Sequence, residues 1–175
     1  MNLANILTTS RIILTPCCIL FILWGIPYNR LIALAIFIVA FLTDVFDGYI
    51  ARTNKTVSNF GKLFDPLADK ILMIAVLVSL AYKINALWCW LAVGIIWMRE
   101  IFIALMRRWR VPKGVATEAN LYGKTKTFLQ ALAVCTLILN IFVAPYLLWA
   151  AALFSVFSGI IYIKSWSAQG NKTSA

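Results

Sequence analysis

The chain has 175 residues, 63% of them hydrophobic, and its mean hydropathy is +0.90. Because apolar residues make up only about 45–50% of a soluble domain, this composition excludes an ordinary soluble protein and predicts an integral membrane protein. The net charge of +10 does not indicate nucleic-acid binding, because the basic residues lie at the ends of apolar segments, where they can meet anionic lipid headgroups.

Six apolar segments, each long enough to cross a lipid bilayer as a helix, follow one another along the chain. They cover residues 6–26, 31–52, 64–82, 86–108, 121–141 and 145–166. Turn-forming and helix-breaking residues separate them, including Asn85 and Pro145. The sequence therefore predicts an all-α integral membrane protein with six transmembrane helices, in which residues 1–166 form a single six-helix domain and residues 167–175 form a disordered tail.

Basic residues in short connections set the orientation of such a protein, because the positive side faces the cytosol. Of the 16 Lys and Arg residues, only Arg30 and Lys83 fall on one side of the predicted bundle. We therefore expect both termini, the tail and the polar loops 52–63 and 109–120 to be cytosolic. This orientation puts residues 44–69, which connect the second and third predicted spans, at the cytosolic membrane boundary.

The stretch "DVFDGYIARTNKTVSNFGKLFDPLAD" contains four of the chain's six acidic residues, namely Asp44, Asp47, Asp65 and Asp69. Helical spacing puts the first two on one face of the second predicted helix and the last two on one face of the third. Ionised carboxylates near hydrocarbon need protonation, pairing with Arg or Lys, or a bound cation. Hard cations such as Mg²⁺ or Mn²⁺ prefer carboxylate oxygen. Asp65 alone could instead be a helix cap before Pro66.

Metal sites built from histidine or cysteine ligands are excluded by the composition of the chain. The chain has no histidine, and its four cysteines lie within apolar runs without the spacing of a zinc site. A metal held by soft ligands is therefore not expected, and any metal must be bound by oxygen.

The same stretch reads D-x₂-D-G-x₂-A-R-x₈-G-x₃-D-x₃-D and resembles the signature of the CDP-alcohol phosphotransferase family at every specified position. Together with the six-span layout, the resemblance covers nearly the whole chain. Members of this family transfer a substituted phosphate from a CDP-linked donor to an acceptor hydroxyl and release CMP.

The resemblance also implies roles for particular residues. It implies two Mg²⁺ or Mn²⁺ ions per active site, bound by Asp44, Asp47, Asp65 and Asp69, with Asp69 acting also as the general base. The cytidine diphosphate would be received by Gly48, Ala51, Arg52 and Gly61, although small residues are needed for close helix packing in any case. The family resemblance further implies a homodimer.

A second polar region, residues 99–127, contains seven basic residues around one predicted cytosolic loop. An acceptor that carries a phosphate needs such donors, and the residues expected to bind it are Arg99, Arg107, Arg108, Lys124 and Lys126. The alternative, for about half of the basic residues, is contact with lipid headgroups alone. Arg99 differs because it lies deep in the fourth predicted span beside Glu100, and charges within a membrane usually serve a function.

With "NILTTSRIILTP" near the N-terminus, this region resembles bacterial phosphatidylglycerophosphate synthases. That resemblance implies a single in-line displacement in which CDP-diacylglycerol and glycerol 3-phosphate give phosphatidylglycerol phosphate and CMP, at the inner (cell) membrane of a bacterium. Thr8 and Arg11 are expected to contact the nucleotide or its phosphates, although Thr8 could equally be a helix cap.

Three other functions remain open. A sister enzyme of the same family could use another acceptor, for example a cardiolipin synthase using phosphatidylglycerol. A divalent-cation transporter could use the aspartates as its transport site, but that function does not explain the spacing of Gly48, Ala51 and Gly61. The third is a catalytically silent membrane scaffold.

Overall fold

A computed structural model describes the backbone of residues 3–24, 28–54, 59–110 and 121–172, and the side chains of residues 13–24, 28–43, 71–106 and 123–164. This described backbone contains six α-helices and no strand. The helices are α1 (Leu3–Leu23), α2 (Asn29–Asn54), α3 (Asn59–Ile84), α4 (Leu87–Arg110), α5 (Leu121–Leu139) and α6 (Ala144–Lys172). Each corresponds to one of the six apolar segments, so the all-α prediction is confirmed.

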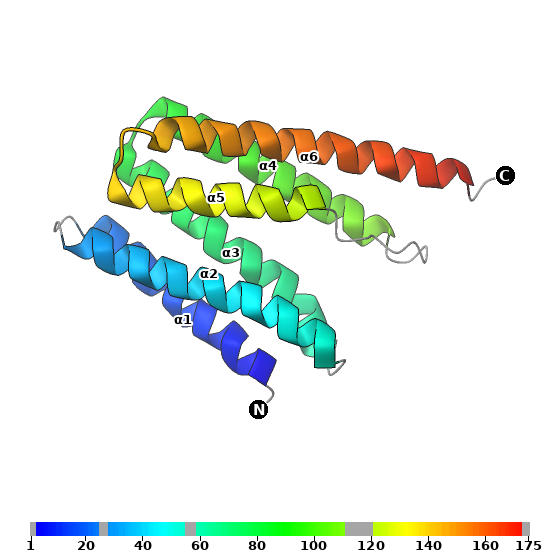
Figure 1. Cartoon of the computed structure of the whole chain (residues 1–175), viewed down its shortest axis with the longest axis horizontal. Coiled ribbons are helices and arrows are strands. Elements are labelled where there is room, and N and C mark those ends of the chain that lie inside the picture. Colours follow the sequence, from blue (N-terminus) through cyan, green and yellow to red (C-terminus); the bar gives the residue numbers. More distant parts are fainter. Residues whose placement is uncertain (1–2, 25–27, 55–58, 111–120, 173–175) are drawn as a thin grey trace.

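The helices alternate in direction along one bundle (Figure 1). The connections α1–α2, α3–α4 and α5–α6 gather at one end, which we call the short-connection end. At the opposite end α1 begins, α2 gives way to α3, and α6 finishes. Helix α1 packs against both α2 and α3, α6 packs against α4 and α5, and α5 contacts α2 and α3. Helices α2 and α3 run antiparallel, as the predicted layout of consecutive spans requires.

Two asparagines stop helices at the short-connection end. Asn85 follows α3 with a φ angle of 49°, and Asn140 follows α5 with a φ angle of 56°. Asparagine tolerates this left-handed conformation, which commonly ends helices. After α5, the Ile141 N–H donates to the Thr136 carbonyl over 3.1 Å. This hydrogen bond, which joins residues five positions apart, is typical of the Schellman motif. Pro145 then occupies the first turn of α6, where its missing N–H costs little.

Small residues let the helices approach one another. Among the side chains that the structure describes, seven alanines on five helices have no exposed surface: Ala33, Ala40, Ala81, Ala92, Ala133, Ala151 and Ala152. Larger side chains such as Phe37, Leu77 and Leu148 fill the space between them. In lipid there is little hydrophobic drive between helices, so association depends on this close van der Waals packing.

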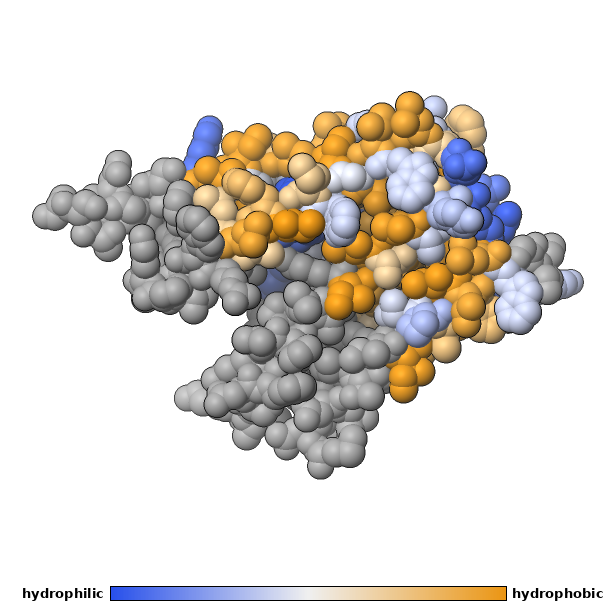
Figure 2. Space-filling model, turned by 180° about the vertical axis from the view of Figure 1, so that it is seen from behind, coloured by the Kyte–Doolittle hydropathy of each residue, from blue (hydrophilic) through white to orange (hydrophobic). Residues whose placement is uncertain are grey.

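The described outer surface carries many large hydrophobic side chains. Figure 2 shows that hydrophobic residues cover most of the described surface on one face, with a hydrophilic patch at the short-connection end. Within the described residues, two stretches, Leu87–Met106 and Ala144–Lys164, are long and apolar enough to cross a membrane, and only 33% of each is buried. Because most of each apolar helix faces outward, this surface suits a membrane protein.

Helix α6 is longer than the sequence predicted. Its helical backbone continues to Lys172, into the segment 167–175 for which we expected disorder. Ser167, Ala168 and Gln169 are compatible with a helix, and the single Gly170 costs only about 1 kcal/mol relative to alanine. The polarity of this segment therefore marks where the apolar span ends and does not mark where the helix ends.

Candidate active site

The residues of the aspartate motif lie on two antiparallel helices. Asp44, Asp47, Gly48, Ala51 and Arg52 belong to α2, and Gly61, Asp65 and Asp69 belong to α3. Their side chains lie outside the described residues, as do those of Thr8, Arg11, Arg107 and Arg108. Among the side chains that the structure describes, Glu100 is the only carboxylate. Metal binding by the four aspartates therefore stays a prediction.

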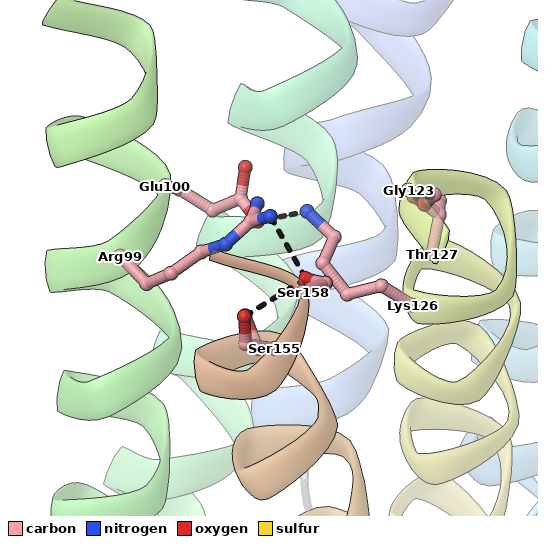
Figure 3. Close-up of polar contacts among 7 residues, drawn as sticks. All are labelled: Arg99, Glu100, Gly123, Lys126, Thr127, Ser155 and Ser158. Atoms are coloured by element: carbon pink, nitrogen blue, oxygen red, sulfur yellow. Dashed lines mark hydrogen bonds and ion pairs between the residues drawn. The ribbon is translucent and has the colours of Figure 1, made fainter. Parts of the chain in front are cut away.

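The described part of the site is a cluster of buried charges between three helices (Figure 3). Arg99 and Glu100 extend from α4, Lys126 from α5 and Ser158 from α6 toward a common centre. The Arg99 Nη1 donates to Glu100 Oε1 over 3.1 Å, and the Lys126 Nζ donates to the same oxygen. The Arg99 Nη2 donates to the Ser158 hydroxyl over 2.8 Å. One carboxylate thus holds two cations.

Counted over its three described ionic side chains, this cluster carries a net positive charge of one, because Arg99 and Lys126 are positive and Glu100 is negative. These side chains are only 8–13% exposed, so water cannot screen them well. Charges this far inside a helix bundle are expensive unless they are paired and hydrogen-bonded. The surplus positive charge therefore favours an anionic ligand at this place.

Helix α6 shapes the space around Arg99. A Cβ atom on Gly159 would lie 3.4 Å from both Cγ and Nε of Arg99, so a methyl group there would just touch the Arg99 side chain and a larger side chain would press against it. Beside it, the Ser158 hydroxyl donates to the Ser155 carbonyl over 2.9 Å. This bond directs the Ser158 oxygen lone pairs toward Arg99.

Some polar atoms in this region have no hydrogen-bond partner within the described structure. They are Arg99 Nε, Gln130 Nε2 and Ser155 Oγ, and each is buried. Gln130 is only 3% exposed and lies one helical turn beyond Lys126 on the same face of α5. Buried polar groups are normally hydrogen-bonded, so these donors and acceptors mark a place where a polar ligand could bind.

Only some of the residues predicted to bind the acceptor meet in the structure. Arg99 and Lys126 are brought together through Glu100. Lys124 is exposed, because residues two positions apart on a helix face different directions.

Three polar residues near the cluster were not predicted from the sequence, namely Gln130, Ser155 and Ser158. The sequence feature that could have indicated these three residues is the spacing of polar residues within apolar helices. The two serines are three positions apart in α6, and Gln130 comes four positions after Lys126 in α5. Such spacing places each pair on one helix face.

Comparison with known proteins gives the family to which this site belongs. The family model of the CDP-alcohol phosphatidyltransferases matches residues 1–157. This match covers all of α1 to α5 and about half of α6. The chain belongs to the CDP-alcohol phosphatidyltransferase family.

Curated relatives are similar to the chain over most of their own length. A protein of Bacillus subtilis (strain 168) named CDP-diacylglycerol–glycerol-3-phosphate 3-phosphatidyltransferase is 37% identical, over 95% of this chain and 96% of its own length. A protein of the same name from Rickettsia bellii (strain RML369-C) is 36% identical over 94% of both chains. A probable phosphatidylglycerophosphate synthase of Mycobacterium tuberculosis (strain ATCC 25618 / H37Rv) is 36% identical, over 93% of this chain and 80% of its own.

Proposed function

We propose that this protein transfers the phosphatidyl group of CDP-diacylglycerol to glycerol 3-phosphate, giving phosphatidylglycerol phosphate and CMP. The observation that carries the proposal is the similarity, over nearly the whole chain, to curated relatives with this named activity. A similarity limited to the aspartate motif would support only the family, because the motif acts on the CDP-linked donor and the acceptor differs between members.

The buried charge cluster supports an acceptor that carries a phosphate. Arg99 and Lys126 supply the donors, and Glu100 holds both in place while its single charge neutralises only one of them. Arg offers a planar fork of donors that suits a phosphate. We propose that Arg99 and Lys126 bind the phosphate of glycerol 3-phosphate, with Arg107 and Arg108 farther along α4 contributing to the same site. A cationic acceptor would be repelled from this place.

Members of this family generally depend on divalent metal ions. The donor set of this chain fits such ions, because Asp44, Asp47, Asp65 and Asp69 offer carboxylate oxygens in a chain without histidine. We propose that these four residues hold Mg²⁺ or Mn²⁺, with two ions per site. When bound, the metal would neutralise charge on the diphosphate and on the departing CMP.

Measured along the helices, two of the four aspartates, Asp44 and Asp69, fall at about the same depth as the charge cluster. Asp44 lies about four helical turns after the start of α2, and Asp69 lies about four turns before the end of α3. Glu100, Lys126 and Ser158 are also about four turns from the corresponding ends of α4, α5 and α6. With a rise of about 1.5 Å per residue, these five residues are roughly 20 Å from the short-connection end, and Asp47 and Asp65 lie about one helical turn farther away. This correspondence supports a single site in which donor and acceptor meet.

The proposed reaction is one in-line displacement. Asp69 accepts the proton of the terminal hydroxyl of glycerol 3-phosphate, and that oxygen forms a bond to the lipid-bearing phosphorus. The bond from this phosphorus to the oxygen of the CMP group breaks, and CMP leaves with the bonding electrons. Arg99 and Lys126 hold the acceptor through its own phosphate, which is not transferred, so their contribution is to positioning. Gly48, Ala51, Arg52 and Gly61, with Thr8 and Arg11, would receive the nucleotide end of the donor.

We further propose that all six helices span a bacterial inner (cell) membrane, with both termini and the aspartate end of the bundle in the cytosol. The distribution of basic residues supports this orientation, and a water-soluble acceptor and nucleotide product need a site open to the cytosol. Residues 1–166 would form the single catalytic domain. A homodimer is proposed on the family resemblance.

The experiment that tests the function uses purified full-length protein in detergent with CDP-diacylglycerol and Mg²⁺ or Mn²⁺. CMP release is followed with glycerol 3-phosphate, phosphatidylglycerol, inositol, serine and choline offered separately. The proposal expects release with glycerol 3-phosphate. Release with phosphatidylglycerol alone would indicate a cardiolipin synthase instead, and no release with any acceptor would contradict an enzyme of this class.

A further inference from the structure

A pocket of about 270 Å³ lies among α1, α2, α3 and α5 near the short-connection end. Its walls are aliphatic, and its three polar residues are Arg30, Lys83 and Asn140; the aliphatic lining consists of Ile22, Ala33, Leu80, Ile84, Leu137 and Ile138. The aspartate motif occupies the other end of α2 and α3. The reaction proposed above therefore makes no use of this pocket.

Arg30 and Lys83 bring two positive charges to the pocket, and none of the described residues that line it is acidic. Glu100, the only acidic side chain in the described part of the chain, is paired with Arg99 and Lys126 instead. Lys83 donates to the Ile22 carbonyl near the end of α1, and an ammonium group has two further N–H donors. Two cations that share one pocket repel each other, and a bound anion would relieve that repulsion.

Exposed aromatic residues surround this end of the bundle. Trp24 is 64% exposed, Tyr28 78%, Tyr82 69% and Tyr146 66%. All four lie beside the short connections, at the end of α1, before α2, in the last turn of α3 and in the first turn of α6. Trp and Tyr collect where a membrane meets water, because their rings are apolar and their polar atoms reach the headgroups. The pocket thus lies at the depth of lipid headgroups.

We propose that this pocket binds the phosphate of an anionic phospholipid headgroup in the leaflet at the short-connection end. Arg30 and Lys83 donate to the phosphate oxygens, and the aliphatic wall takes the adjoining carbons of the lipid. The pocket is smaller than a typical ligand site, which measures at least about 300 Å³. This size suits a headgroup and excludes a whole lipid. The same chemistry would accept free phosphate, so the two sources need separate measurements.

The test compares the parent protein with Arg30→Glu, which keeps the contact between Lys83 and Ile22. The full-length protein is placed in phosphatidylcholine nanodiscs with and without dioleoylphosphatidylglycerol, and lipid retained after delipidation is quantified by mass spectrometry. Loss of a charge-assisted hydrogen bond should weaken retention of the anionic lipid by about 10- to 150-fold. Inorganic phosphate, added to phosphatidylcholine nanodiscs and read as a shift in melting temperature, provides the second arm. Retention of lipid that depends on Arg30 identifies the headgroup as the source, and protection by phosphate alone overturns the lipid assignment.

Two matched variants serve as controls for net charge and for the place of binding. Lys164→Glu makes the same change of net charge at an exposed position on α6, and should retain lipid like the parent. Lys126→Met removes a cation from the charge cluster. If Lys126→Met lowers lipid retention and Arg30→Glu does not, the lipid binds at the charge cluster and the proposal is wrong. If Arg30→Glu does not fold, Arg30→Gln replaces it, and equal retention by a folded variant and the parent also contradicts the proposal. Because binding is measured and not turnover, either result leaves the proposed reaction untouched.

Discussion

The Nζ atom of Lys126 and the carboxylate of Glu100 form an ion pair between α5 and α4 in which the two side chains are only 8% and 9% exposed. Arg99, the neighbour of Glu100, shares the same carboxylate oxygen. The three groups depend on one another, because removal of the carboxylate leaves two buried cations facing each other. This relationship determines which substitutions should disturb folding and which should disturb substrate binding.

Glu100→Gln should destabilise the protein. Removing one partner of a buried pair typically costs about 3–5 kcal/mol, so the melting temperature in detergent should fall by several degrees. The double variant Glu100→Gln with Lys126→Met should recover part of that loss, because one unpaired cation is also removed. Melting temperatures of the four proteins in this cycle measure the coupling. Equal stability of Glu100→Gln and the parent would mean that the cluster is open to water.

Lys126→Met should raise the apparent KM for glycerol 3-phosphate by about 10- to 150-fold, the worth of a charge-assisted hydrogen bond. The KM for CDP-diacylglycerol should change little, because we propose that the donor binds at the aspartate motif. Lys124→Met is the matched control, since Lys124 is exposed two residues away on the same helix. Similar effects of the two substitutions on either substrate would argue that both lysines only face lipid headgroups.

Gly159→Leu should displace Arg99. The Cβ atom alone would be 3.4 Å from Arg99 Cγ and Nε, so the branch beyond it must push the guanidinium away. Overpacking of this kind costs about 1–3 kcal/mol, and if that cost falls on acceptor binding, kcat/KM for glycerol 3-phosphate drops by about 5- to 150-fold. Gly94→Leu on α4 is the control, because a Cβ there meets nothing within 4 Å. If the two leucine variants have the same kinetics, Arg99 does not act in acceptor binding.

Asp44→Asn, Asp47→Asn and Asp65→Asn should each abolish CMP release while the protein still folds. Asparagine keeps the shape of the side chain but loses the charge that attracts a hard cation. Retained melting temperature together with lost turnover is the expected pattern, and metal titrations should show weaker binding. Appreciable turnover in two of the three variants would remove the assignment of these residues as metal ligands.

Asp69→Asn should behave differently from the other three. If Asp69 is the general base, donor binding persists, and single-turnover CMP release slows by about 10²- to 10⁴-fold, the usual contribution of a positioned base. Excess Mn²⁺ should not restore the rate. Full recovery at high Mn²⁺ would show that Asp69 is mainly a ligand and that the proton goes elsewhere.

The helices were predictable from the sequence because their limits are local. Asn85 and Pro145 mark helix ends by their own backbone preferences, and the apolar runs between such residues are long. The extension of α6 to Lys172 could not be predicted in this way, because polarity marks the end of the apolar span and a helix can continue past it.

The charge cluster was only partly predictable. Arg99 was identified because a charge deep in an apolar segment is unusual. The contacts of the cluster were not predictable, since those between positions 100 and 126, or 99 and 158, depend on how α4, α5 and α6 pack. Nothing in the sequence favours Lys126 over Lys124, because only the rotation of α5 buries one and exposes the other.

Whether glycerol 3-phosphate accepts the phosphatidyl group and keeps its own phosphate is the central question. It is tested most directly with glycerol 3-phosphate labelled with ³²P, incubated with the purified protein, CDP-diacylglycerol and metal, followed by lipid extraction and mass spectrometry. We predict that the label enters the lipid phase as phosphatidylglycerol phosphate, with one CMP released for each labelled lipid. CMP release without label in the lipid, or formation of cardiolipin from added phosphatidylglycerol, would contradict the proposed reaction.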